Sequence, residues 1–135
     1  MPQIADTGFL VAYWNRADAH HDWARGLAVS APLRTCEAVL TEAAYLIGQP
    51  EPLLQMLVDG DLVLAFDAAS HAPELLRWLE KFADQDPGLA DACVVRLAEL
   101  HPRDEVLTTD RGDFAVYRTL GGRAIRCRFP SQPRA

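Results

Sequence analysis

Cysteine is scarce in this chain of 135 residues, and long hydrophobic runs are missing from it. The three cysteines, Cys36, Cys93 and Cys127, lie far apart among apolar neighbours, a pattern that fits neither a disulfide framework nor a zinc site. No segment approaches the ~20 consecutive apolar residues that cross a bilayer, and the first residues lack the basic and apolar blocks of a signal peptide. We therefore expect reduced cysteines in a cytoplasmic protein with no membrane partner.

Lysine is nearly absent as well, because Lys81 is the only lysine among 13 basic residues and all the others are arginine. A guanidinium group suits bidentate contacts with phosphate or carboxylate, although an arginine-rich genome would produce the same bias. The net charge of −6 is unevenly distributed: residues 1–110 carry 18 acidic and 7 basic side chains, whereas residues 111–135 carry 1 and 6. The C-terminal segment is therefore a candidate for contact with anionic groups.

Internal repeats, low-complexity tracts and linkers are also missing. Half of the residues are hydrophobic and 24% are charged, a composition that excludes disorder and provides for one core. We expect a single domain over residues 1–135, with residues 130–135 as a flexible tail.

Short apolar segments alternate with helical patterns along the chain. Strands are predicted at 3–5, 33–36, 62–66, 106–109 and 124–129, and helices at 9–14, 18–29, 37–47, 52–58, 73–82 and 89–100. Asp18 is the expected cap of the second helix, and 110–113 is an expected polar turn. Strands that alternate with helices of about 10 residues predict an α/β domain with a mainly parallel sheet, in which sites form where strands end and helices begin.

Four acidic residues occupy positions of this kind: Asp6, Glu42, Asp91 and Asp110. Asp6 and Asp110 directly follow predicted strands, and Asp91 lies in the first turn of a predicted helix. Ordinary structural roles remain open for these three residues. Asp6 could cap a helix, the helix dipole favours Asp91, and Asp110 could occupy a turn together with Asp113.

Glu42 is harder to explain by local structure, because its neighbours at helical spacing are apolar: Ala38, Val39, Tyr45 and Leu46. We therefore expect Glu42 on the buried face of its helix. Glutamate is almost never fully buried unless it is paired, so the structural alternative is a buried ion pair with an arginine.

Several carboxylates that converge on one edge repel one another, so some of them must be protonated or must share a cation. Because the candidate ligands are oxygen atoms only, Mg²⁺ or Mn²⁺ is the expected ion. Such an ion binds phosphate oxygens and lowers the pKa of a coordinated water, which indicates hydrolysis of phosphodiester bonds.

Four segments, in this order and at these separations, resemble the PIN domain, particularly the VapC-type toxin ribonucleases of bacterial toxin–antitoxin pairs. They are Asp6-Thr7-Gly8, Thr41-Glu42-Ala43, Leu89-Ala90-Asp91-Ala92 and the run from Leu107 through Phe114. The resemblance covers essentially the whole chain. It implies a Rossmann-like three-layer α/β/α fold with a mainly parallel central sheet. It also implies a Mg²⁺- or Mn²⁺-dependent endoribonuclease that forms a homodimer and is neutralised by a cognate antitoxin.

By the same resemblance, the metal-binding and catalytic carboxylates would be Asp6, Glu42, Asp91 and Asp110. The possible helpers would be Asp113, Thr109 and Thr7. Gly88 stands where relatives often have a polar residue, so no further ligand is implied there.

The expected reaction is in-line attack of an activated water on phosphorus, which leaves 5′-phosphate and 3′-hydroxyl ends. An acidic pocket does not attract RNA by itself, so basic residues are needed along the approach. By position, the candidates for RNA binding are Arg111, Arg118, Arg123, Arg126 and Arg128.

Other functions fit the sequence less well. A haloacid-dehalogenase-type phosphatase needs a second aspartate two residues after the first, where this chain has Gly8. A receiver domain needs a lysine after a late strand, and Lys81 lies on a predicted helix. A PIN-like domain without catalysis, which acts through protein partners, remains the alternative.

Histidines and tryptophans receive structural interpretations. The histidines share no ligand spacing, so we expect no metal role for His20, His21, His71 and His101. The tryptophans lie in apolar periodic segments, which favours core or dimer packing over base stacking for Trp14, Trp23 and Trp78.

Overall fold

The computed structural model describes residues 2–29 and 32–131, and its centre is a five-stranded parallel sheet with strand order β3-β2-β1-β4-β5. The strands are β1 (Gln3–Ala5), β2 (Leu33–Thr35), β3 (Leu62–Leu64), β4 (Glu105–Leu107) and β5 (Cys127–Arg128). The expected α/β class and parallel sheet are therefore confirmed.

Helices fill the connections between the strands. The α-helices are α1 (Thr7–Trp14), α2 (His21–Gly26), α3 (Glu37–Ile47), α4 (Glu51–Val58), α5 (Ala72–Lys81), α6 (Leu89–Leu100) and α7 (Arg111–Phe114), with 3₁₀ turns η1 (Ala68–His71) and η2 (Ala83–Gln85). In the described part of the chain, no helix is long and apolar enough to span a bilayer.

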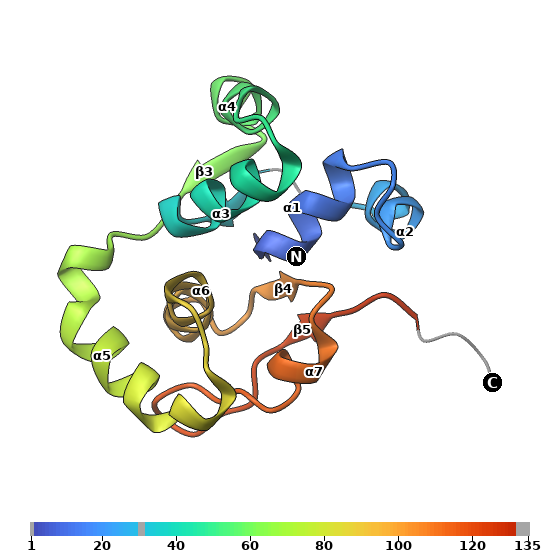
Figure 1. Ribbon diagram of the computed structural model, residues 1–135. Helices are drawn as coiled ribbons and strands as arrows, with labels where there is room; N and C mark the ends of the chain where they lie inside the picture. Colours follow the sequence, from blue (N-terminus) through green and yellow to red (C-terminus); the bar gives the residue numbers. More distant parts are fainter. Residues whose placement is uncertain (1, 30–31, 132–135) are drawn as a thin grey trace.

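The order of the strands explains the layers. The chain moves from β1 through β2 to the edge strand β3, and then returns to place β4 on the other side of β1. Right-handed crossovers in opposite directions place their helices on opposite faces of the sheet. Figure 1 shows α1 to α4 in the upper half of the molecule and α5, α6 and α7 in the lower half.

This reversal makes the carboxyl ends of β1 and β4 the place where a ligand site is expected in an α/β sheet. The two strands are directly paired, and Ala5 lies opposite Leu107 in the register. Asp6 therefore leaves β1 beside the segment that leaves β4. The backbone confirms this, because the Asp6 N–H donates to the Leu107 carbonyl at 3.1 Å.

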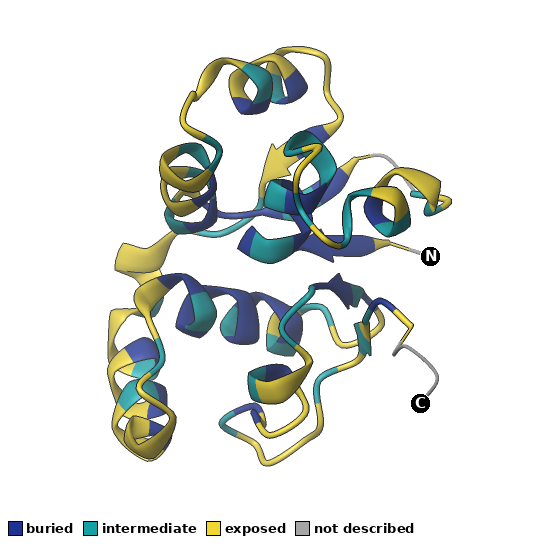
Figure 2. Cartoon of the chain, turned by 45° about the vertical axis from the view of Figure 1, so that its right-hand side comes forward, coloured by how far each residue is buried: buried dark blue, intermediate teal, exposed yellow. Residues whose placement is uncertain are grey.

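The core lies around β1, β4 and α6. All three residues of β1 are buried, as expected for an inner strand of a parallel sheet covered on both faces. Seven residues of α6 are buried, and Figure 2 shows this helix and the inner strands in the colour of buried residues. Because β1 is buried and α6 is mostly buried, we expect the residues at their ends to be fixed in position.

Two of the three cysteines, Cys36 and Cys93, are buried, and all three are free thiols, as the sequence indicated. Trp78 is also in the core, while Trp14 and Trp23 are partly buried against it, which confirms their packing role.

Several predicted boundaries were wrong. Helix α2 begins at His21, because the Asp18 side chain accepts a hydrogen bond from the His20 N–H at 2.8 Å and so closes a turn before the helix. The expected polar turn at 110–113 contains the start of a short helix, α7, and the last strand contains only two residues.

The expected tail at 130–135 lies mostly outside the described residues. Pro130, its first residue, is buried, and its carbonyl accepts a hydrogen bond from Arg111 at 3.1 Å. The chain is therefore still packed against the domain at this residue.

Candidate active site

Asp6 occupies the N-cap position of α1 but does not cap the helix with its side chain. Its carboxyl group turns instead toward the end of β4, where the Thr108 hydroxyl donates to Oδ2 at 2.7 Å. Its other oxygen, Oδ1, is buried and has no hydrogen-bond partner among the described residues. Capping therefore does not explain this aspartate, and an acceptor oxygen is left available in a buried position.

Thr108 connects two of the acidic residues. While its hydroxyl donates to Asp6, the same oxygen accepts a hydrogen bond from the Asp110 N–H at 3.0 Å. Asp110 in turn caps α7, because its Oδ1 accepts from the Asp113 N–H at 3.0 Å. The sequence analysis considered a turn role for Asp110; the structure shows a helix cap instead, which fixes this carboxylate at the same edge of the sheet as Asp6.

Asp91 approaches from the opposite layer, in the first turn of α6. Its Oδ2 accepts a hydrogen bond from the Tyr117 hydroxyl at 2.9 Å. The N-terminal end of α6 meets the carboxyl edge of the sheet because this helix runs antiparallel to the strands, as a crossover helix must.

These carboxyl groups lie close enough for their charges to affect one another. Burial raises the pKa of Asp6 to about 7; the Thr108 hydrogen bond acts against this shift, and the charges of Asp91 and Asp110 add to it. Burial likewise raises the pKa of Asp91 to about 6, with Tyr117 acting in the opposite direction and with further increases from Asp110, Glu42 and Asp113. An excess of negative charge is therefore concentrated at this edge.

Glu42, on α3, is near enough for its charge to raise the pKa of Asp91. Its side chain is exposed, so the expectation of a buried position was wrong. The buried residues of α3 are only Val39 and Ala43, whereas Tyr45 is 84% exposed. Helix α3 has apolar side chains on more of its surface than the rest of the domain covers. Its apolar pattern therefore does not predict which side of the helix is buried.

The three expected helper residues lie beside the four carboxylates. Thr7 is buried, and its hydroxyl has no partner in the described part of the chain. The Thr109 hydroxyl lies against α1, only 2.2 Å from where a Cβ on Gly8 would stand. Burial and the neighbouring Asp110 raise the pKa of Asp113. A side chain at residue 8 would displace Thr109, which explains the glycine after Asp6-Thr7.

Comparison with known proteins decides the family. The PIN domain model matches residues 4–119, which is most of the chain. The chain belongs to the PIN-domain family. This PIN domain is also similar to a curated protein named Ribonuclease VapC26 from Mycobacterium tuberculosis, with 30% identity over 132 residues, covering 88% of this chain and 94% of that protein. The three-layer fold expected from the resemblance is thereby confirmed.

The donor atoms of this PIN domain are carboxylate oxygens, the kind of ligand that a hard divalent cation prefers. One of them, Asp6 Oδ1, is buried and has no hydrogen-bond partner in the described part of the chain. Among residues 2–29 and 32–131, however, no three His, Cys, Asp or Glu side chains are arranged to hold a metal ion together. The acidic side chains would therefore have to turn toward an ion as it binds.

Most of the predicted RNA-binding arginines lie away from the carboxylates. Arg111 begins α7, directly after Asp110, and its guanidinium lies 4.6 Å from the centre of the Phe129 ring. Arg118 donates to three carbonyls in the segment that follows α7, with distances of 2.9 to 3.3 Å. Arg128 pairs with Glu105, its Nε lying 3.0 Å from Oε1.

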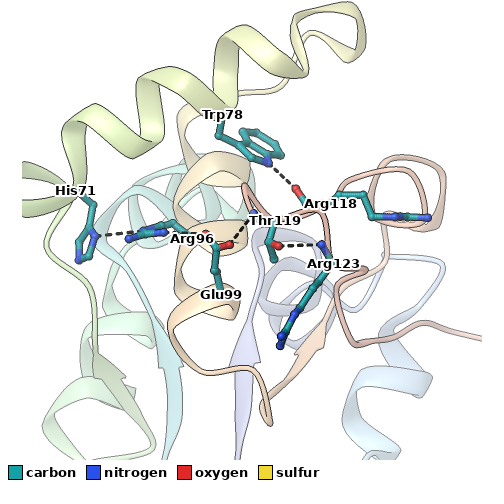
Figure 3. Close-up of polar contacts among 8 residues, drawn as sticks. His71, Trp78, Arg96, Glu99, Arg118, Thr119 and Arg123 are labelled. Carbon is teal, nitrogen blue, oxygen red and sulfur yellow. Dashed lines mark hydrogen bonds and ion pairs between the residues drawn. The ribbon is translucent and has the colours of Figure 1, made fainter.

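Arg123 and Arg126 lie near the amino ends of the strands. Together with Glu99 and Asp104, they line a pocket of about 280 Å³ beyond the C-terminal end of α6. Figure 3 shows Arg123 close to Thr119 and Glu99, with its N–H donating to the Thr119 hydroxyl. The structure does not bring these two arginines to the carboxylate edge.

Two residues of the site were missed by the sequence analysis. Thr108, which was not among the expected helper residues, makes the hydrogen bond to Asp6. The strand alternation could have indicated this, since Thr108 and Asp110 are two residues apart. Tyr117 had no comparable signal, because it lies in an irregular segment after α7.

Proposed function

We propose that this PIN domain is a Mg²⁺- or Mn²⁺-dependent endoribonuclease and the toxin of a toxin–antitoxin pair. The observation that carries the proposal is the convergence of Asp6, Asp91 and Asp110 at the carboxyl edge of the sheet, where burial and mutual repulsion raise the pKa of two of them. Carboxylates arranged in this way favour a cation between them. The ribonuclease name of the similar mycobacterial protein supports RNA as the substrate.

Asp6, Asp91, Asp110 and Glu42 would hold the cation, which would act as a Lewis acid toward phosphate and lower the pKa of a water. The chain itself positions these ligands: Thr108 holds one oxygen of Asp6, the other oxygen has no partner among residues 2–29 and 32–131, and the cap of α7 holds Asp110. Attack by water in line with the leaving oxygen gives 5′-phosphate and 3′-hydroxyl ends, and the 2′-hydroxyl of the RNA does not react.

The test is to sequence new 5′ ends after total bacterial RNA is incubated with the purified protein. We expect discrete cuts with Mg²⁺ or Mn²⁺ and none with EDTA, and a loss of about 100-fold or more in cleavage by Glu42→Gln. Because Glu42 is exposed, this change should leave the fold intact. Cuts that persist in EDTA, or 2′,3′-cyclic phosphate ends, would contradict the mechanism.

A second copy of the chain and a cognate antitoxin are the proposed protein partners. Helices α3 and α4 present large apolar side chains to solvent, of which Tyr45 is 84% and Val58 is 79% exposed. Exposed apolar surface of this kind is typical of interaction sites. If antitoxin-free, folded protein cuts no RNA with any divalent cation, these helices support the alternative of a PIN-like domain that acts only through its partners.

Arg111 is the proposed contact for the RNA backbone, because it lies beside Asp110 at the carboxyl edge. Replacing Arg111 with Ala should weaken RNA binding and reduce the slope of log K against log salt by about 1, as expected for one lost phosphate contact. Arg123→Ala is the matched control, since Arg123 lies at the other end of the strands.

The measurement is fluorescence anisotropy of labelled RNA in EDTA over a range of salt concentrations. EDTA prevents cleavage during the titration if the reaction needs a metal. If Arg123→Ala lowered the affinity and the salt slope more than Arg111→Ala, the approach of RNA from the carboxylate edge would be wrong.

A further inference from the structure

The hydroxyl group of Tyr117 contacts a carboxylate of the site although the residue belongs to none of the motifs. Tyr117 is completely buried, and its hydroxyl donates to Asp91 Oδ2 at 2.9 Å. The two residues come from different elements: Asp91 lies in the first turn of α6, and Tyr117 follows α7. The contact therefore links the helix that presents Asp91 to the segment that follows Asp110.

The Tyr117 ring is held by other aromatic rings. The centres of Trp78, Phe82 and Phe114 lie 4.9, 5.8 and 5.2 Å from its own, and all three rings are arranged edge to face with it. Such pairs stabilise a specific geometry in addition to the burial of apolar area. The phenol therefore has little freedom to rotate away from Asp91.

The backbone around Tyr117 is fixed as well. Its own N–H donates to the Asp113 carbonyl at 2.9 Å, and the indole N–H of Trp78 donates to the next carbonyl, that of Arg118, at 2.8 Å. Figure 3 shows the bond from Trp78, which reaches this segment from α5. Trp78 of α5 thus fixes the segment that contains Tyr117, whose hydroxyl group donates to Asp91 on α6.

A carboxylate that accepts a hydrogen bond on one oxygen is fixed in orientation. With Oδ2 engaged by Tyr117, Oδ1 is the oxygen of Asp91 that remains for a ligand. Hydrogen bonds from outer residues to ligating side chains orient the ligands in this way and contribute strongly to metal affinity.

We propose that Tyr117 is a positioning residue, which holds Asp91 so that one carboxylate oxygen is presented to the divalent cation. This inference rests on the proposed function, because it assigns a cation to the site. Tyr117 touches neither the RNA nor the cation, and it acts through Asp91 alone.

The test compares Tyr117→Phe with Tyr13→Phe. Both changes remove only a hydroxyl group, but Tyr13 lies on α1 and its ring packs against Arg25, whose Cζ is 3.9 Å from the ring centre. Calorimetric titration with Mg²⁺ or Mn²⁺ should show binding that is about 10- to 100-fold weaker in Tyr117→Phe and unchanged in Tyr13→Phe. Circular dichroism should show the native fold in both variants, because phenylalanine fills the same space.

A double-mutant cycle separates positioning from a general loss of packing. In an Asp91→Ala background, Tyr117→Phe should cause no further loss of cation affinity, since its effect passes through the missing carboxylate. Two results would overturn the positioning role and leave the proposed function standing. One is equal cation affinity in Tyr117→Phe and wild type; the other is that Tyr117→Phe lowers cation affinity by the same factor in the Asp91→Ala background as in wild type. A wild-type protein that binds no divalent cation would overturn both the positioning role and the proposed function.

Discussion

Replacing Asp6 with asparagine should stop RNA cleavage and, at the same time, make the metal-free protein harder to unfold at pH 8. Asp6 is 3% exposed and has a pKa raised to about 7, so at pH 8 its ionised form is held in the native state at a cost. Asparagine has nearly the same shape, accepts the same hydrogen bond from Thr108, and carries no charge. It would also make a poorer ligand for a divalent cation.

We expect a fall in cleavage of about 100-fold or more and a rise in the free energy of unfolding of about 2 to 4.5 kcal/mol. The upper value corresponds to the full shift of the Asp6 pKa, at about 1.4 kcal/mol for each unit. RNA cleavage with Mg²⁺ and urea unfolding in EDTA at pH 8 are the measurements. Asp22→Asn, an exposed change on α2, is the control and should alter the free energy of unfolding by less than about 1 kcal/mol.

An Asp6→Asn protein that is less stable than wild type at pH 8 would contradict this argument, since it would mean that the ionised carboxylate contributes to the fold. Full cleavage by the same variant would instead remove Asp6 from the proposed set of ligands. The two results are independent, so stability and activity test different parts of the interpretation.

The metal-free protein should lose stability as the pH rises from about 4 to 7. The pKa values of Asp6 and Asp91 are raised to about 7 and about 6 from the ordinary value of 3.8, so in this range the native state holds protons that the unfolded chain has already released. Because the native state binds more protons, the free energy of unfolding falls as the pH increases. Above about pH 7 these two groups are ionised in both states and contribute no further change.

A divalent cation should reverse this loss. Mg²⁺ requires ionised carboxylates, so its stabilising effect should be small at pH 5 and should reach about 2 to 3 kcal/mol at pH 8 when its concentration is 100 times the dissociation constant. Urea unfolding at several pH values, with EDTA or with Mg²⁺, measures both effects. If the free energy of unfolding in EDTA rises between pH 5 and pH 7, or if Mg²⁺ does not stabilise the protein at pH 8, Asp6 and Asp91 are not buried carboxylates that gain from a bound cation.

The ends of the inner strands could be predicted from the sequence because their polarity changes abruptly. Asp6 and the Thr108 to Asp110 segment follow short apolar runs, and parallel strands with helical crossovers bring such ends together at one edge. Three of the four predicted carboxylates are placed there by topology alone. That these three carboxylates lie near one another could therefore be predicted without knowledge of side-chain packing.

The remaining features depended on tertiary packing or on strand direction. The side of α3 that is buried depends on which helices pack against it, and Glu42 lies outside that contact. Arg126 precedes β5, and because β5 is parallel to the other strands, Arg126 lies at the amino edge of the sheet. Closeness in sequence to Asp110 therefore does not predict which arginines lie at the carboxyl edge. Tyr117 reaches Asp91 only because three aromatic rings from other segments enclose it.

The contact between Asp6 and Thr108 spans 102 residues of sequence, and Tyr117 lies further still toward the C-terminus. Contacts so distant in sequence carry a large entropic cost of loop closure. During translation, a nascent chain that ends before Thr108 has neither the partner of Asp6 nor Asp110. Asp6, Glu42, Asp91, Asp110 and Tyr117 are therefore present together only after residue 117 has been synthesised.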